Sequence, residues 1–229
     1  MSAISFPHHR RGIVPLAVAI VAVGAAIALP VAGDQAADAH TAVTQSHRLT
    51  SRELQLRDGM RKLWEDHITW TRLAIVSFAA GLPDFDLTAQ RLLRNQVDIG
   101  NAIKPYYGRR AGNQLTALLK EHIAGAVEVL KAAKSGDTAS FDAAKAAWYR
   151  NGDQIARFLS RANPRNWPFG DVRALMRGHL DLTIDEAAAR LQGDFAADIR
   201  AYDRVHQHIL MFADALSSGI VKQFPRRFR

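Results

Sequence analysis

Apolar residues recur at helical spacing along the chain from Thr50 onward, and no stretch shows the strict alternation expected of a half-buried strand. Gly, Pro and Asp interrupt this periodicity at five places, and each interruption is followed by a new apolar stripe. The pattern therefore predicts an all-α fold, a six-helix bundle preceded by an N-terminal apolar segment. The predicted breaks lie at residues 81–84, 105–108, 135–137, 163–171 and 193–194.

A fixed spacing links three histidines to three of these breaks. Each histidine follows a leucine by four residues and precedes a glycine by fourteen, in the sets Leu63/His67/Gly81, Leu118/His122/Gly136 and Leu175/His179/Gly193. The histidines are 55 and 57 residues apart, which predicts one helical hairpin repeated three times. The repeat leaves open whether the hairpins close into a bundle or form an open stack.

A polar residue follows each of these histidines by 29 positions, within the apolar stripe of the second helix of its hairpin. These residues are Gln96, Asn151 and His208. The first turn is two residues longer than the others, so Asp98 is an alternative counterpart to Gln96. The spacing predicts one inward polar pair in each hairpin, all at the same level of the bundle.

The first interpretation of these pairs is structural. A buried imidazole needs a hydrogen-bond partner, and an amide or a second imidazole across the hairpin supplies one. A buried polar pair also fixes the register between two helices. Under this interpretation the chain is a binding or interaction protein, and its inner histidines hold the scaffold together.

The alternative interpretation is a metal or small-ligand site in which the hairpins meet around a common axis. Neutral imidazoles with one carboxylate suit Zn, Fe or Mn and leave a coordination position open. The spacing differs from the ferritin-type Glu-x-x-His pair and from the His-Glu-x-x-His motif. The candidate ligands are His67, His122, His179, His208, Asp98 and Asp153.

The N-terminus has the features of a targeting segment. His8, His9, Arg10 and Arg11 precede an apolar run over residues 13–29, and an Ala-Asp-Ala sequence follows at 37–39. This order is typical of a secretory signal peptide, while the length of the run also suits an uncleaved membrane anchor. We therefore expect a signal or anchor at 1–39, a linker at 40–50, the helical domain at 51–222 and a basic tail at 223–229, with export to the cell envelope or the exterior.

Charge and composition limit the classes of binding partner and site that the chain can have. The chain has 229 residues, a formal net charge of +8 and no cysteine, so disulfides, thiolate metal ligands and a cysteine nucleophile are excluded. A basic balance suits an envelope protein, an anionic lipid or an acidic wall polymer, and we expect no nucleic acid. The segment 104–110 mixes bases and aromatic rings and is a candidate contact for such a polymer, although a helix–helix connection needs no such role.

The residues also resemble a known family. The segments 63–72, 79–84, 105–108, 121–122, 179–183, 197–199 and 219–225 are similar to an uncharacterised bacterial family of helical proteins. Some members carry the label acetylglutamate kinase, which implies an α/β fold with glycine-rich nucleotide loops, and the chain shows neither feature. No activity follows from the resemblance. Since no catalytic motif is present either, the sequence favours a non-enzymatic protein without deciding the question.

Overall fold

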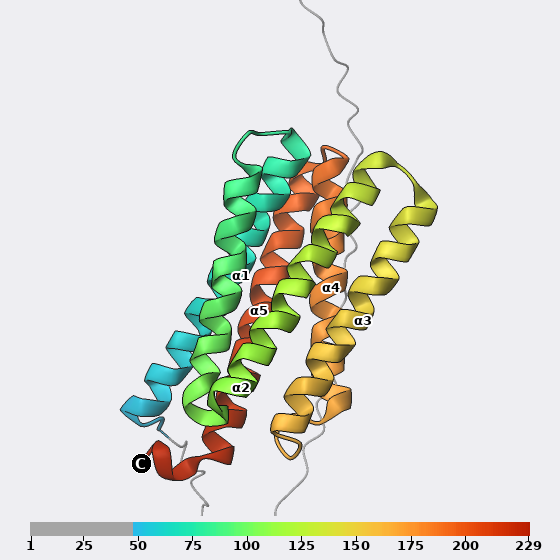
Figure 1. The fold of residues 1–229 in the computed structure, drawn as a ribbon. Helices are drawn as coiled ribbons and strands as arrows, with labels where there is room; N and C mark the ends of the chain where they lie inside the picture. Colours follow the sequence, from blue (N-terminus) through green and yellow to red (C-terminus); the bar gives the residue numbers. More distant parts are fainter. Residues whose placement is uncertain (1–47) are drawn as a thin grey trace, which may run out of the picture. The chain divides into compact units, whose positions relative to one another are not determined.

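The computed structural model describes residues 48–229, and within them it contains five α-helices, one 3₁₀ helix and no strand (Figure 1). The predicted signal or anchor at 1–39 lies outside the described residues, as does most of the linker. No helix in the described part is long and apolar enough to cross a bilayer. The helices are α1 (Ser51–Ala80), α2 (Phe85–Ser135), α3 (Thr138–Ala162), α4 (Phe169–Leu191), α5 (Phe195–Gln223) and η1 (Pro225–Arg227).

The structure has five α-helices in its described part where the sequence predicted six, because α2 spans two of the predicted helices. At the expected break only Gly108 leaves the helical conformation, with φ 84° and ψ 167°, so α2 continues on both sides of a kink. The two halves of α2 then approach closely. A Cβ atom on Gly100 would lie 2.6 Å from the carbonyl oxygen of Gly112. The halves therefore pack backbone against backbone, and α2 supplies the second helix of one hairpin and the first helix of the next.

Left-handed glycines form the turn within each hairpin. Gly81, Gly136 and Gly193 all have positive φ, from 65° to 76°, which a glycine adopts without strain. Asp137 accepts a hydrogen bond from the backbone N–H of Ala139 (3.0 Å) and so caps α3. The same spacing from histidine to glycine therefore produces the same left-handed turn in every hairpin.

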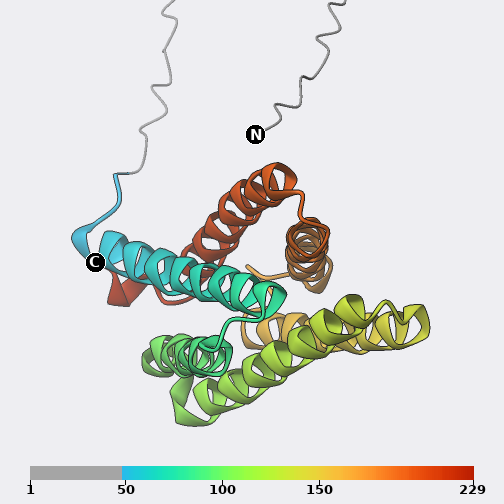
Figure 2. The same cartoon turned by 90° about the horizontal axis from the view of Figure 1, so that it is seen from above.

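The hairpins close into a ring of packed neighbours rather than an open stack. Each helix packs against the next in the chain, and α5 packs against α1, as the view from above shows (Figure 2). α4 also contacts α1 and α2 across the interior. The main core cluster includes Trp64, Ile155, Leu180 and Phe212, and the last three are 0% exposed.

The C-terminal residues pack against the beginning of the bundle. Phe228 is 4% exposed, and its ring stacks on Tyr106 with 5.8 Å between centroids. The hydroxyl of Thr50, the N-cap of α1, donates a hydrogen bond to the carbonyl of Phe228 at 2.8 Å. The segment that we expected as a basic tail thus contributes a buried aromatic ring to the end of the bundle.

Candidate functional site

Three histidines from three helices come together inside the bundle. His67 on α1, His122 on α2 and His179 on α4 are each at most 3% exposed. The ring centroid of His179 lies 5.6 Å from that of His67 and 6.2 Å from that of His122. The equal depth predicted from the repeat therefore brings one imidazole from each hairpin to the centre, and His179 lies next to the other two.

His67 is held by the amide of Gln96, the residue predicted by the 29-residue spacing. Gln96 Nε2 lies 3.2 Å from His67 Nδ1, 2.9 Å from the carbonyl oxygen of Leu92 and 3.1 Å from Asn95 Oδ1, so its two hydrogens are shared among three acceptors. An amide nitrogen only donates, so this orientation of the amide assigns His67 Nδ1 as the acceptor and the proton of the neutral ring to Nε2. Asp98, the alternative counterpart, is exposed on the other side of α2.

His122 has the opposite tautomer. Its Nδ1 lies 3.0 Å from Asn151 Oδ1, while the amide nitrogen of Asn151 donates to the carbonyl of Leu118. Since the amide oxygen only accepts, His122 carries its proton on Nδ1 and has a lone pair on Nε2. Both predicted pairs, His67–Gln96 and His122–Asn151, are confirmed.

The third predicted pair does not form. His208 Nε2 donates instead to the carbonyl of Leu175 at 2.8 Å, and Nδ1 of the buried His179 has no hydrogen-bond partner in the described part of the chain. A second repeat nevertheless becomes visible in these contacts. In every hairpin a side chain of the second helix donates to the carbonyl of the leucine that precedes the histidine by four residues, from Asn95 to Leu63, Asn151 to Leu118 and His208 to Leu175.

Burial keeps the three imidazoles neutral. Desolvation lowers the pKa of His67 to about 3 and that of His122 to about 4. The pKa of His179 is likewise lowered, first by its burial and then by the neighbouring His67, His122 and His208. Because all three rings are uncharged at neutral pH, they offer hydrogen bonds and lone pairs but no positive charge for an anion.

The histidines surround a chamber of about 30 Å³, which Thr71 and Thr183 also line. Pockets for organic ligands typically have volumes of about 300–1,000 Å³. The chamber is therefore far too small for a cofactor and has room for little more than one water molecule or ion.

The other predicted ligands lie away from the chamber or are already engaged. Asp153 forms ion pairs with Arg173 (3.0 Å) and Arg177 (3.0 Å), which lower the pKa of its carboxyl group. Asp153 is therefore engaged by arginines and Asp98 is exposed, while His208 lies close enough to lower the pKa of His179 but has its Nε2 bonded to the carbonyl of Leu175. Among residues 48–229, no set of three or more His, Asp or Glu side chains has a geometry that could hold a metal ion.

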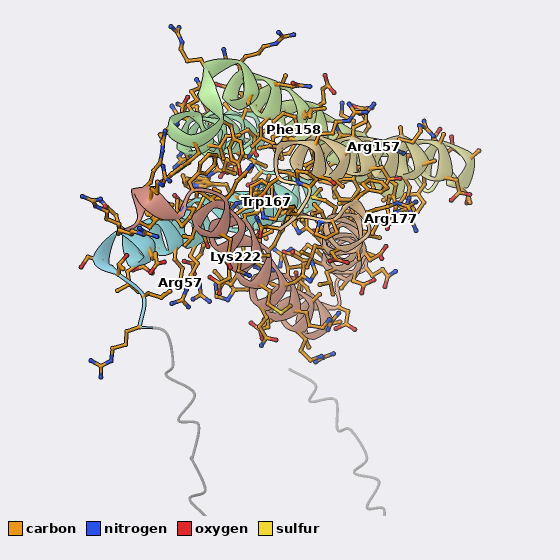
Figure 3. All side chains as sticks on the ribbon, turned by 90° about the horizontal axis from the view of Figure 1, so that it is seen from below. Arg57, Arg157, Phe158, Trp167, Arg177 and Lys222 are labelled. Carbon is orange, nitrogen blue, oxygen red and sulfur yellow. The ribbon has the colours of Figure 1, made fainter. Side chains whose placement is uncertain are left out.

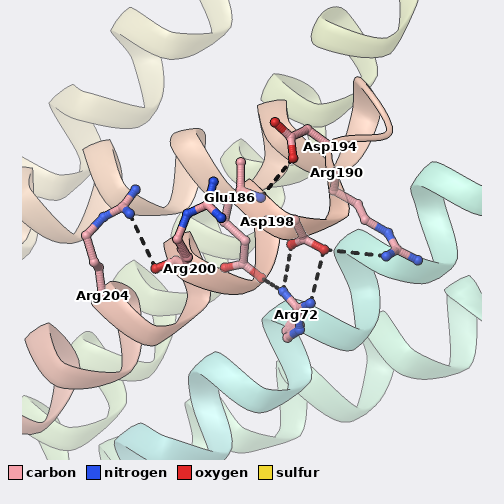
Figure 4. Close-up of polar contacts among 8 residues, drawn as sticks. Arg72, Glu186, Arg190, Asp194, Asp198, Arg200 and Arg204 are labelled. Atoms are coloured by element: carbon pink, nitrogen blue, oxygen red, sulfur yellow. Dashed lines mark hydrogen bonds and ion pairs between the residues drawn. The ribbon is translucent and has the colours of Figure 1, made fainter. Parts of the chain in front are cut away.

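A buried ionic cluster, which the sequence analysis missed, lies closer to the turns (Figure 4). Arg72 on α1 donates to Glu186 on α4 at 2.8 Å and to both carboxylate oxygens of Asp198 on α5, at 2.7 and 3.1 Å. The carboxylates are 1% exposed, and Arg190 contacts Asp198 at 3.4 Å. Burial raises the pKa of Glu186 to about 7 although Arg72 opposes the shift. The only signal in the sequence was the position of Glu186 in the same apolar stripe as His179.

The chain was compared with protein-family models, with curated proteins and with solved structures, and nothing matches it. The resemblance to a bacterial helical family consequently stays a prediction, and the geometry of the described residues is the basis for the function proposed next.

Proposed function

We propose that this chain is a non-enzymatic binding protein of the cell envelope, in which the inner histidines serve to hold three hairpins in register. The observation that carries this proposal is the pairing of His67 with Gln96 and of His122 with Asn151, each inside a single hairpin. Both rings thus have a partner from their own hairpin that satisfies one buried nitrogen.

The tautomers support a structural role over metal binding. A metal at the centre needs a lone pair from each ring. His122 has one available on Nε2, but the bond from Gln96 leaves a proton on Nε2 of His67. A metal site would require His67 to change tautomer and to lose its bond to Gln96, which is also held by Leu92.

The envelope location rests on the order of charged, apolar and Ala-Asp-Ala segments in residues 1–39. The formal net charge of +8 suits the anionic lipids and polymers of such a location. A fusion of residues 1–50 to a reporter enzyme that is active only outside the cytoplasm tests this part of the proposal, and an inactive reporter contradicts it.

A second candidate function is the binding of one Zn, Fe or Mn ion by His67, His122 and His179. It is favoured by one observation, the buried Nδ1 of His179, which has no partner within residues 48–229. Buried groups of this kind call for an explanation, and an ion or a water molecule is a common one.

Elemental analysis of the purified full-length chain, prepared without affinity tag or chelator, decides between the two candidates. The structural proposal expects less than about 0.1 equivalent of transition metal, before and after incubation with Zn, Fe or Mn salts. It also expects the His122→Ala variant to lose thermal stability with no change in metal content. One tightly bound equivalent that is lost in this variant would establish the metal site instead.

A further inference from the structure

A groove of about 590 Å³ runs between α3 and the part of α2 from Tyr107 onward. Its volume is in the range of small-molecule sites, about twenty times that of the histidine chamber. Residues from one face of each helix line it, among them Tyr107 and Leu118 on α2 and Arg157 and Phe158 on α3. Figure 3 shows Arg157 and Phe158 on α3 from below the bundle.

Packing explains why the groove opens at this end of the hairpin. Nearer the turn, the ring of Trp148 lies against Gly125, where an added Cβ would be 2.9 Å from the indole. α2 and α3 therefore approach closely at that level. Toward Tyr107 the α2 face presents the short side chain of Ala111, which leaves space between the helices.

Two arginines one helical turn apart face this space. Arg157 and Arg161 both line the groove and are exposed, and neither forms an ion pair with another described residue. The guanidinium carbon of Arg157 lies 4.9 Å from the ring centroid of Phe169, a cation–π contact that orients the side chain.

Two other pairs with the same spacing show what such arginines do elsewhere in the bundle. Arg57 and Arg61 share the carboxylate of Asp214, and Arg173 and Arg177 share that of Asp153. Each pair thus binds one carboxylate on a neighbouring helix. Arg157 and Arg161 have the same arrangement but face a groove instead of an aspartate, so an acidic group from a ligand has two guanidinium partners there.

The rest of the groove suits a ring with hydroxyl groups. The amides of Gln114 and Gln154 both donate and accept hydrogen bonds, and the carboxylate of Glu121 at the far end accepts them. The half-buried ring of Phe158 adds an apolar surface to the lining. An acid group, several hydroxyls and one apolar ring face are the features of an acidic sugar.

We infer that this groove binds an acidic saccharide, with its carboxylate or phosphate between Arg157 and Arg161 and its hydroxyls against the glutamine amides. This inference rests on the proposed binding function and names the ligand class of that function. It involves none of the three central histidines, so its failure would leave their role unaffected.

The experiment is calorimetric titration of the purified full-length chain at low ionic strength with digalacturonate, glucose 6-phosphate, the neutral disaccharide cellobiose and inorganic phosphate. The first two distinguish a carboxylate from a phosphate, and the last two separate the ring from the charge. We expect saturable binding of at least one sugar acid. Cellobiose and inorganic phosphate should bind at least tenfold more weakly.

The double variant Arg157→Gln with Arg161→Gln should weaken that binding at least tenfold and leave the melting temperature within about 2 °C of the wild type. The matched control is Arg94→Gln, because Arg94, on α2, is likewise an exposed arginine without an ion pair in the described part and is not among the groove residues. It should bind as the wild type does. Equal binding of cellobiose, an unaffected double variant, or no saturable binding of either sugar acid up to about 10 mM would each overturn the inference.

Discussion

Trp148 binds His122 twice, through its ring and through its nitrogen. The indole N–H donates to the backbone carbonyl of His122 at 2.9 Å, and the indole ring stacks on the imidazole with centroids 5.1 Å apart. Asn151, one turn further along α3, holds Nδ1 of the same imidazole. One helix thus fixes the position, the tautomer and the ring plane of a histidine on another helix. This arrangement argues that His122 is a structural residue of the core.

Removal of the amide partner of His122 should therefore destabilise the bundle. In the Asn151→Ala variant both His122 Nδ1 and the carbonyl of Leu118 lose their partner. Unsatisfied buried groups cost about 1–3 kcal/mol each, so we expect the free energy of unfolding to fall by about 2–4 kcal/mol. Urea titration measures the change. Asn113→Ala is the control, since Asn113 is exposed on α2, and a loss of similar size there would contradict the assignment.

Two glycine-to-alanine changes within helices should have opposite effects. Gly59 is exposed on α1 and an added Cβ meets nothing within 4 Å, so Gly59→Ala should stabilise the protein by up to about 1 kcal/mol through helix propensity. At Gly100 the new Cβ would meet the backbone of Gly112 at 2.6 Å. We expect Gly100→Ala to lower the melting temperature although the residue gains the same propensity, and a rise there would show that the two halves of α2 are not so closely packed.

Stability should fall as the solution becomes acidic. The pKa of His67 is lowered from 6.5 to about 3 and that of His122 to about 4, so the unfolded chain binds more protons than the folded one between these values. Their contribution is fully present above pH 6.5 and is lost as the pH falls to about 4 for His122 and about 3 for His67, at up to about 1.4 kcal/mol per pH unit for each proton.

Glu186 acts in the opposite direction. Its pKa is raised from 4.5 to about 7, so its contribution is present below pH 4.5 and is lost as the pH rises to 7. With at least two histidines against one glutamate, the net effect is a decline below pH 6.5. Urea titrations at pH 7.5, 6 and 5 measure it, and the Glu186→Gln variant should show a steeper decline. Stability that stays constant over this range would contradict the neutral, buried histidines.

Because Arg72 is the main positive partner in the buried ionic cluster, we expect its substitution to destabilise the protein strongly. Arg72→Met leaves Asp198 and Glu186 buried without their main positive partner. Breaking a buried ion pair on one side costs about 3–5 kcal/mol, and we expect a loss of that order in urea titration. A second change, Glu186→Gln, should restore part of it. For comparison, Lys62→Gln removes only an exposed i, i+4 pair with Asp66 and should change stability by less than about 0.5 kcal/mol.

The features that could be predicted from the sequence are local to one hairpin. The interval from His67 to Gly81 is the distance along α1 from the histidine to the glycine that ends the helix. The interval from His67 to Gln96 follows because the next helix runs antiparallel to α1. The kink at Gly108 was predicted as a break, but periodicity does not show that a single non-helical residue is enough to turn the chain between two helical segments.

The repeat describes single hairpins, so it could not predict which residues of different hairpins meet. Arg72, Glu186 and Asp198 come from three helices, and their meeting depends on how the first hairpin packs against the third. The pairing of His179 with His208 was wrong for a related reason. Gly178 leaves room for the ring of His208 close to the α4 backbone, where an added Cβ would lie 3.0 Å from it, and the ring donates to Leu175 rather than to His179.

The contact of α5 with α1 also limits how this architecture can grow. In an open array of hairpins, duplication of one unit lengthens the protein and leaves the other interfaces intact. Here the last helix already covers the first, and Thr50 binds the carbonyl of Phe228 across that junction. A fourth hairpin would have to separate these helices and expose their apolar faces. The copy number of the repeat is therefore fixed at three by ring closure, and related chains should vary in their loops rather than in the number of hairpins.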